Sequence, residues 1–428
     1  MKRSPVAAYL QTRAITAPWR IAGCGESGFA GAVVIPALAE SKRLFATLTS
    51  LAANSPEILA RFLVLVVVNH REDAPAADKD DNYRTLARLA TAASALPSLR
   101  LAWIDAASPG LELPNKGGGV GLARKVGLDL ALTRLDHGTS PSLLVCLDAD
   151  TLVEPSYLPA LVRHFRETTA GGAAIPFRHQ PGASHEEQGA IDRYELFLRH
   201  YVLGLRLARS PYAFHTVGSA MACTTAAYAR SGGMNTRTAG EDFYFLQHLS
   251  RTAGIAPVQG TVVYPSPRPS HRVPFGTGRS VSRWLGGDDG AITFYRPDCF
   301  RILGRWLELV QTGLDTPAGE LMAGAREISP HLAEYLEDVR FAETWQGLRR
   351  NHLVPQRLLA AFHGWFDGLR TIKLIHHLSA QEFLRCGPEE ALPGLLRLAG
   401  EEPVAGVGAQ LALLRMMEEG DGCKALSP

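Results

Sequence analysis

The sequence has almost no excess of charge of either sign. Its 44 basic and 42 acidic residues leave a formal net charge of +2. No block of five or more lysines and arginines occurs. This balance excludes the basic surface that marks nucleic-acid-binding proteins, so we expect no nucleic-acid partner. An anionic ligand must therefore be bound by local groups.

Paired cysteines and long apolar runs are also lacking. The six cysteines are scattered singly with no Cys-x-x-Cys pair, which excludes a zinc knuckle and fits a reducing compartment. The most apolar run, residues 62–68, is too short to cross a bilayer, and the N-terminus has no apolar core of signal-peptide length. We expect a cytoplasmic protein with no transmembrane segment. Peripheral membrane contact and the oligomeric state stay open.

Short apolar runs alternate with segments of helical periodicity. Strands are predicted at 31–40, 62–69, 99–105 and 142–150, and helices at 41–53 (with Ser41 as a possible N-cap), 82–96 and after the glycines at 117–121. This alternation predicts an α/β fold with a parallel sheet. Strand signals fade beyond about residue 290. We therefore expect an N-terminal extension (1–30), an α/β domain (31–290) and a helical C-terminal region (291–428).

Two carboxylates, Asp148 and Asp150, stand at the end of the predicted strand at 142–150, where the strand meets a loop. Ligands of open parallel sheets bind beyond the carboxyl ends of the strands. Two carboxylates separated by one residue could hold a divalent ion, and hard oxygen ligands suit Mg²⁺ or Mn²⁺. The alternative is a helix N-cap or a solvated turn, since Asp-x-Asp is common by chance.

A second acid pair, Glu241-Asp242, stands before the aromatic helical run FYFLQHL. Acids at a helix start are also expected from capping and from the helix dipole. The functional interpretation makes Asp242 a general base that takes the proton of an acceptor hydroxyl.

Basic and glycine-rich segments supply further candidates. Lys116 opens a glycine cluster that enters a helix carrying Arg124, where backbone N–H groups could meet phosphate, although a plain flexible loop is equally compatible. The cluster is neither a P-loop nor a dinucleotide fingerprint. Downstream, His271 could complete a metal site, and Arg272 with its neighbour Arg268 could meet phosphate oxygens.

In this order and spacing the motifs resemble family 2 glycosyltransferases of the GT-A fold. The resemblance covers roughly residues 31–280. It rests on the segments VVIPALAESKRLFATLTSL, LVVVNHRED, GVGLARKVGLDLAL, LLVCLDADTLVEPSYL and GSAMACTTAAYARSGGMNTRTAGEDFYFLQHL. Lys125 stands where this family usually has Asn.

The resemblance implies a Rossmann-like, mostly parallel mixed sheet flanked by helices, with a helical C-terminal region. It implies transfer from a UDP- or GDP-linked sugar to an acceptor hydroxyl, with inversion and with Mg or Mn as cofactor. The residues implied are Asp242 and Glu241 for catalysis, Asp148, Asp150 and His271 for the metal, and Pro36, Glu40, Asn69, Asp73, Lys116, Arg124, Asp148 and Arg272 for the nucleotide-sugar.

Three rival functions stay open to different degrees. A retaining GT-A transferase of the mannosylglycerate-synthase type shares the fold and the metal motif. A non-catalytic nucleotide-sugar-binding protein would bind the donor without turnover. A sugar-phosphate nucleotidyltransferase is disfavoured, because its glycine-rich signature should follow the first strand, where this chain has PALAESKR.

Overall fold

The computed structural model describes residues 4–138, 141–269, 276–288 and 290–419. The chain forms two compact units, and each consists of two segments. We call Met1–Gly182 with Thr216–Arg279 the α/β unit, and Ala183–His215 with Ser280–Pro428 the helical unit. Residues 183–215 thus belong to the helical unit, although they lie inside the range 31–290 that the sequence predicts for the α/β domain.

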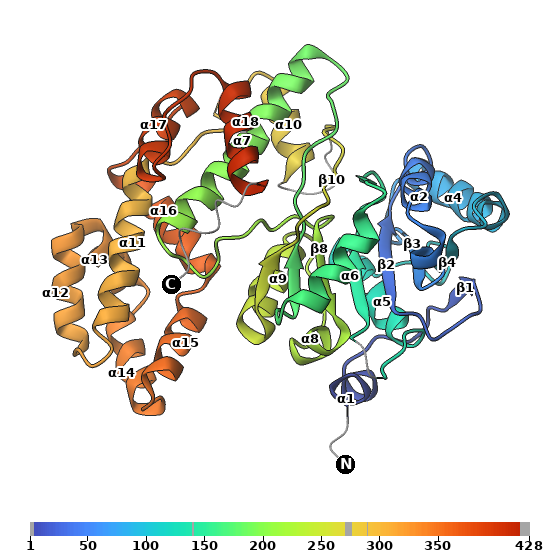
Figure 1. The fold of residues 1–428 in the computed structure, drawn as a ribbon, viewed down its shortest axis with the longest axis horizontal. Coiled ribbons are helices and arrows are strands. Elements are labelled where there is room, and N and C mark those ends of the chain that lie inside the picture. The colour runs from blue at the N-terminus through green and yellow to red at the C-terminus, as the bar shows by residue number, and fades with distance from the viewer. Residues whose placement is uncertain (1–3, 139–140, 270–275, 289, 420–428) are drawn as a thin grey trace. The chain divides into compact units, whose positions relative to one another are not determined.

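An eight-stranded sheet forms the centre of the α/β unit, with the strand order β1-β4-β3-β2-β5-β8-β7-β9 (Figure 1). Neighbours are parallel from β4 to β5, and β8 and β1 are antiparallel to their neighbours. The strands are β1 (Ile21–Gly23), β2 (Gly31–Ala37), β3 (Phe62–Asn69), β4 (Arg100–Ala106), β5 (Leu143–Cys146), β7 (Gly172–Ala174), β8 (Met221–Thr224) and β9 (Ile255–Pro257). The predicted class, α/β with a mostly parallel sheet flanked by helices and a helical C-terminal region, is confirmed.

Helices pack against this sheet, and a small second sheet pairs β6 (Leu152–Val153) with β10 (Val263–Tyr264). Every side chain of β3 is buried, as expected for a strand covered on both faces. The helices of this unit are α1 (Pro5–Thr12), α2 (Leu44–Ala52), α3 (Pro56–Leu59), α4 (Ala76–Ala95), α5 (Val120–Leu132), α6 (Tyr157–Glu167), α8 (Thr225–Arg230) and α9 (Glu241–Ala253).

A buried polar cluster joins residues 1–30 to the rest of the α/β unit. The Asp129 carboxylate of α5 accepts hydrogen bonds from the hydroxyls of Tyr9 (2.8 Å) and Tyr228 (2.7 Å) and lies 2.9 Å from Lys125 Nζ. Asp129 is fully buried, so its charge depends on these partners. Lys125 therefore has a structural role here.

Several predicted boundaries move. Ser41 does not cap α2: that helix begins at Leu44, and the Ser41 hydroxyl instead donates to Asp81 Oδ2 at 2.5 Å. Helix α4 begins at Ala76, ahead of the predicted residue 82. Strand β5 ends at Cys146 rather than at residue 150, because the backbone turns there and Thr151 N donates to Asp148 O at 3.1 Å.

The helical unit is built around large aromatic side chains. Trp306, Phe341, Trp345, Phe362 and Phe366 are buried in one cluster with edge-to-face and stacked contacts. Its helices are α7 (His185–Leu207), α11 (Pro297–Thr312), α12 (Ala318–Ile328), α13 (Pro330–Asp338), α14 (Phe341–Asn351), α15 (Pro355–Trp365), α16 (Gly368–Gln381), α17 (Pro388–Leu398) and α18 (Val407–Glu419), together with most of α10 (Thr277–Leu285), whose first three residues belong to the α/β unit. In the described residues, no helix combines the length and apolarity that crossing a membrane requires.

An ion network links α18 to α7 in the helical unit. Glu418 pairs with Arg199 and lies 2.9 Å from His215 Nε2, and Arg199 and Arg415 also bond to Glu195. Burial alone raises the pKa of Glu418, but His215 and Arg199 outweigh it and lower this pKa to about 2. The carboxylate of Glu418 therefore stabilises the folded chain in its charged form.

Glu418→Gln should destabilise the helical unit by about 3–5 kcal/mol at neutral pH, the usual cost of breaking a buried ion pair. Because the folded pKa of Glu418 is depressed, its contribution is complete above its unfolded pKa and is lost as pH falls toward about 2. Urea unfolding as a function of pH measures this. The matched control is Glu327→Gln, an exposed glutamate on α12. Equal stability of the two variants at pH 7 would contradict the prediction.

Candidate functional site

Most of the predicted site residues in the described chain gather at one edge of the sheet. Strands β2, β3 and β5 run parallel and end together at this edge. Glu40 follows β2, Asn69 ends β3, and Asp148 and Asp150 follow β5. Parallel topology brings side chains from distant parts of the sequence to a common edge, as in other open α/β sheets.

A buried arginine connects the two acidic motifs. The Arg124 guanidinium donates one hydrogen bond to Asp148 Oδ1 and another to Glu241 Oε1. The side chains of Arg124 and Glu241 are almost fully buried, whereas that of Asp148 is 38% exposed. We call these three residues the Arg124 cluster. Burial alone lowers the pKa of Arg124, but Asp148 and Glu241 raise it well above its ordinary value, so the guanidinium stays charged.

A second arginine joins the remaining acids at this edge. Arg268 pairs with Glu40 and places its Nε 3.1 Å from Asp150 Oδ2. We call these three residues the Arg268 cluster. The sequence indicated a phosphate contact for Arg268; in the structure two carboxylates bind its guanidinium.

Backbone contacts fix the turn that carries the two aspartates. The hydroxyl of Thr47 donates to Ala149 O at 3.0 Å, and Gln180 Nε2 donates to Asp150 O at 2.8 Å. Gln180 also donates to Tyr264 O at 2.7 Å, which ties the turn to β10. The sequence analysis singled out neither Thr47, although it lies in the first of the segments that carry the resemblance, nor Gln180.

The glycine cluster serves close packing. A Cβ on Gly121 would lie 2.3 Å from Arg237 O, and one on Gly119 would lie 2.9 Å from Thr238 Cα. Both glycines therefore let the segment before α9 lie directly against the start of α5. Lys116 is exposed in this loop. Likewise, a Cβ on Gly218 would lie 2.6 Å from the Arg124 guanidinium nitrogens, so a larger residue would displace the Arg124 cluster.

The acid pair of α9 has two different environments. Gly240 precedes the helix with a φ of 69°, a conformation that favours glycine. Glu241 points into the Arg124 cluster, while Asp242 is partly exposed and its Oδ1 accepts from Phe243 N at 2.8 Å. Burial raises the pKa of both carboxyls above the usual range, and Arg124 opposes the shift.

Other predicted binding residues have structural contacts. The buried Asn69 donates its amide to Val67 O at 3.0 Å and Ala37 O at 3.3 Å, which ties the ends of β3 and β2. Asp73 is exposed and lies 3.0 Å from Arg71 Nε, and Pro36 is part of β2. His271 and Arg272 lie outside the described residues.

Asn82 and His70, which sequence reasoning missed, complete the end of β3. Asn82 on α4 is fully buried: its Oδ1 accepts from Ala39 N, and its Nδ2 contacts Asn69 O and His70 Nδ1. Burial lowers the pKa of His70, which favours the neutral ring. A polar residue on the buried face of the predicted helix at 82–96 was the available sequence signal.

The donor chemistry at this edge suits a hard divalent cation. Asp148 and Asp150 each present a carboxylate. Arg124 donates to one oxygen of Asp148, and Arg268 donates to one oxygen of Asp150. Within the described ranges, no third His, Cys, Asp or Glu joins them in a ligand cluster. Asp148 and Asp150 could therefore hold such a cation only together with further oxygen ligands, such as those of phosphate or water.

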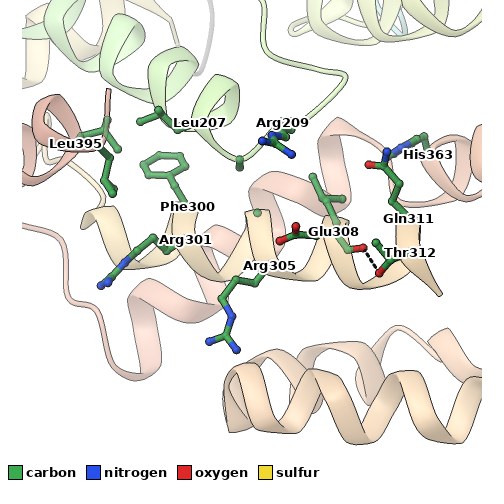
Figure 2. Close-up of a pocket in the computed structure, with 14 residues that line it drawn as sticks. Leu207, Arg209, Phe300, Arg301, Arg305, Glu308, Gln311, Thr312, His363 and Leu395 are labelled. Atoms are coloured by element: carbon green, nitrogen blue, oxygen red, sulfur yellow. Dashed lines mark hydrogen bonds between the residues drawn. The ribbon is translucent and has the colours of Figure 1, made fainter. Parts of the chain in front are cut away.

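A separate pocket lies within the helical unit (Figure 2). It has a volume of about 410 Å³ and is lined by residues of α7, α11, α15 and α17 and of the turn after α7, among them Arg209, Phe300 and Arg305. None of the predicted site residues lines it.

No protein-family model matches the chain, and no curated protein matches its sequence. Similar solved structures include three that differ in source. S. aureus TarS (residues 1–349, in complex with UDP-GlcNAc) is 14% identical over 75% of this chain and 91% of that chain, with a TM-score of 0.39. Mannosyltransferase PcManGT from Pyrobaculum calidifontis, in complex with GDP-Man and Mn²⁺, is 14% identical over 97% of this chain and 96% of that one, with a TM-score of 0.38. A mycobacterial protein is 16% identical over 67% of this chain and 78% of that chain, with a TM-score of 0.35.

Arg124→Gln should lower the free energy of unfolding by about 3–5 kcal/mol, because it leaves buried Glu241 without its charged partner. The double variant with Glu241→Gln should recover part of that loss. Chemical denaturation of the single and double variants forms a double-mutant cycle. Arg61→Gln, at an exposed position, is the control. Additive losses from the two substitutions would show that the pair is not coupled.

Proposed function

We propose that this chain is a glycosyltransferase that moves a sugar from a UDP- or GDP-linked donor to an acceptor hydroxyl with the help of Mg²⁺ or Mn²⁺. The observation that carries the proposal is the convergence of two acidic motifs on Arg124 at the carboxyl edge of a parallel sheet. The order of motifs along the sequence, which resembles family 2 glycosyltransferases, supports the same function.

Asp148 and Asp150 hold the metal in this proposal. When bound, the cation neutralises the charge that develops on the leaving diphosphate. Asp150 is the stronger candidate, because its turn is fixed through Ala149 and through its own carbonyl oxygen. Asp148 shares the ion or contacts the ribose, and Arg124 limits its movement.

Asp242 is the proposed base for an inverting transfer. It stands on the first turn of α9, and its partial exposure gives an acceptor access. A raised pKa suits a group that must accept a proton near neutral pH. Glu241 positions the first turn of α9, because Arg124 binds the Glu241 carboxylate.

Asp150→Asn should abolish metal-dependent donor binding. We expect Mn²⁺ with a UDP- or GDP-sugar to raise the melting temperature of the natural chain, because a ligand that binds only the folded state stabilises it. A panel of donors measured by thermal shift tests this, with Asp80→Asn on an exposed face of α4 as control. Donor-induced shifts of equal size in Asp150→Asn would refute its role, and no shift with any donor in the natural chain would refute donor binding.

Asp242→Asn should retain donor binding and lower kcat by about 10²–10⁴-fold, the usual contribution of a general base. In the natural chain, kcat/KM should fall about tenfold per pH unit below the raised pKa of Asp242, and the variant should lack this acidic limb. Rates of sugar transfer as a function of pH measure both. Full transfer by the variant would remove Asp242 as base.

The rival functions correspond to distinct outcomes of the same assays. A retained anomeric configuration in the product, with an unaffected Asp242→Asn variant, would identify a retaining transferase. Donor binding without turnover on any acceptor would identify a nucleotide-sugar-binding protein.

A further inference from the structure

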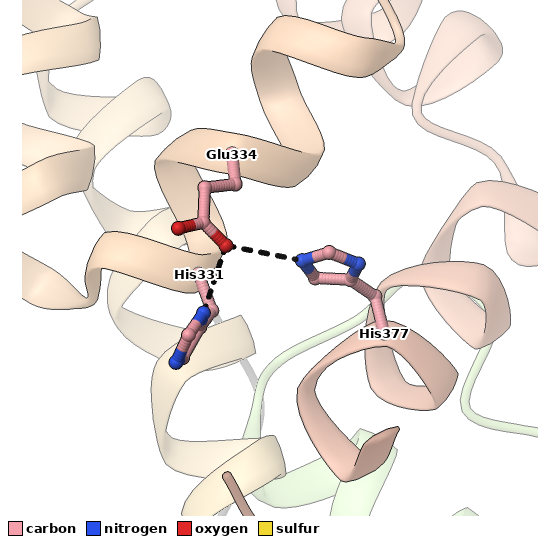
Figure 3. A group of neighbouring side chains, drawn as sticks. All are labelled: His331, Glu334 and His377. Atoms are coloured by element: carbon pink, nitrogen blue, oxygen red, sulfur yellow. Dashed lines mark hydrogen bonds and ion pairs between the residues drawn. The ribbon is translucent and has the colours of Figure 1, made fainter. Parts of the chain in front are cut away.

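The helical unit brings together two histidines and a glutamate from two helices (Figure 3). His331 and Glu334 lie one turn apart on α13, so both side chains leave the same face of the helix. His377 approaches from α16. One ligand atom from each residue lies within 4.8 Å of the other two, and within the described ranges this is the only such cluster of three or more His, Cys, Asp or Glu side chains.

The spacing of these atoms fits one tetrahedral ion. Glu334 Oε2 lies 2.8 Å from His331 Nδ1 and 3.8 Å from His377 Nε2. Ligand atoms of tetrahedral Zn²⁺ at bond lengths of about 2.0–2.1 Å are separated by about 3.3 Å. The two separations from Glu334 bracket this value, and a ligand atom of His331 lies within 4.8 Å of one of His377, so closing the three groups around one ion requires side-chain rotations.

The two helices are held together independently of the cluster. Leu332 and Leu336 of α13 pack in the same buried core as Leu374 and Leu378 of α16. The hydroxyl of Tyr335 donates to Arg370 O at 2.8 Å, which fixes α13 to the first turn of α16. Side chains on packed helices present a metal site more accurately than side chains on loops.

Each imidazole has a carboxylate near its Nε2 atom. His377 Nε2 is buried and has no hydrogen-bond partner in the described chain, only the Glu334 carboxylate at 3.8 Å. His331 directs its other nitrogen, Nε2, toward Glu382 Oε2 at 4.0 Å. This distance is too long for a hydrogen bond, but a rotation of the Glu382 side chain would place its carboxylate behind a ligating His331, as is usual for metal-binding histidines.

We propose that His331, Glu334 and His377 bind one Zn²⁺ ion that clips α13 to α16 in the helical unit. Two imidazoles and one carboxylate select Zn²⁺ over Mg²⁺ or Mn²⁺, which prefer all-oxygen ligands. Three protein ligands leave a fourth position for water. The site is made only of residues of the helical unit and does not depend on the proposed transferase activity.

The test titrates the full chain with Zn²⁺ in the presence of excess Mg²⁺, by calorimetry and by metal analysis after gel filtration. We expect one zinc per chain and a zinc-dependent rise in melting temperature that EDTA reverses. His331→Gln and His377→Gln should each weaken zinc binding at least about 100-fold, because losing a direct ligand costs more than the 10–100-fold loss of an outer-shell partner. Co²⁺ should give the intense visible absorption of a tetrahedral site.

His352→Gln, a histidine at the end of α14, is the matched control and should keep the zinc. Asp150→Asn should also keep it, which separates this site from the proposed donor site. Unchanged zinc affinity in both ligand variants would overturn the proposal, as would octahedral Co²⁺ spectra or no zinc bound at micromolar concentration. If His377→Gln does not fold, the zinc affinity of His331→Gln decides the test, because the His331 side chain is the more exposed of the two.

Discussion

The candidate site depends on the buried ion pairs of Arg124. Its guanidinium has carboxylates on two sides, one from the turn after β5 and one from the start of α9. A buried charge is tolerated only when it is paired, so the fold must bring both acids to this arginine. The glycines at 121 and 218 allow that approach, because a Cβ at either position would overlap its neighbour. The positions of the proposed metal ligands and of the proposed base are thereby coupled.

The Arg268 cluster adds a second set of ion pairs to this edge. Together, the guanidinium groups of Arg124 and Arg268 contact four carboxylates: Asp148, Glu241, Asp150 and Glu40. A divalent ion that arrives with a diphosphate brings little net charge, so it can bind without changing the charge balance of these groups. Arg268 would then need to share Asp150 Oδ2, which makes this arginine the group most affected by donor binding in the proposed function.

The sequence predicted the parts of the fold that local pattern determines. Continuous apolar runs located β2, β3 and β4, and parallel topology then placed Glu40, Asn69 and the two aspartates at one edge. Strands β8 and β9 have only three or four residues, too few for periodicity to define. The partners of Arg124 lie 24 and 117 residues away in the chain, so its ion pairs are a product of tertiary packing. For the same reason, the sequence indicated a nucleotide contact for Arg124 but could not show that two carboxylates bind its guanidinium.

The two units differ in the chemistry of their acidic and basic groups. In the α/β unit, Asp148 and Asp150 contact arginines, and a guanidinium group cannot bind a metal. A cation at the candidate site would therefore be bound by carboxylate and phosphate oxygens. The helical unit places imidazole nitrogens beside a carboxylate, a softer ligand set. Because ligand type separates Mg²⁺ and Mn²⁺ from Zn²⁺, both proposed sites can be filled in one chain without competing for the same ion. The i, i+3 spacing of His331 and Glu334 is visible in the sequence, but His377 joins them only through the packing of α13 on α16.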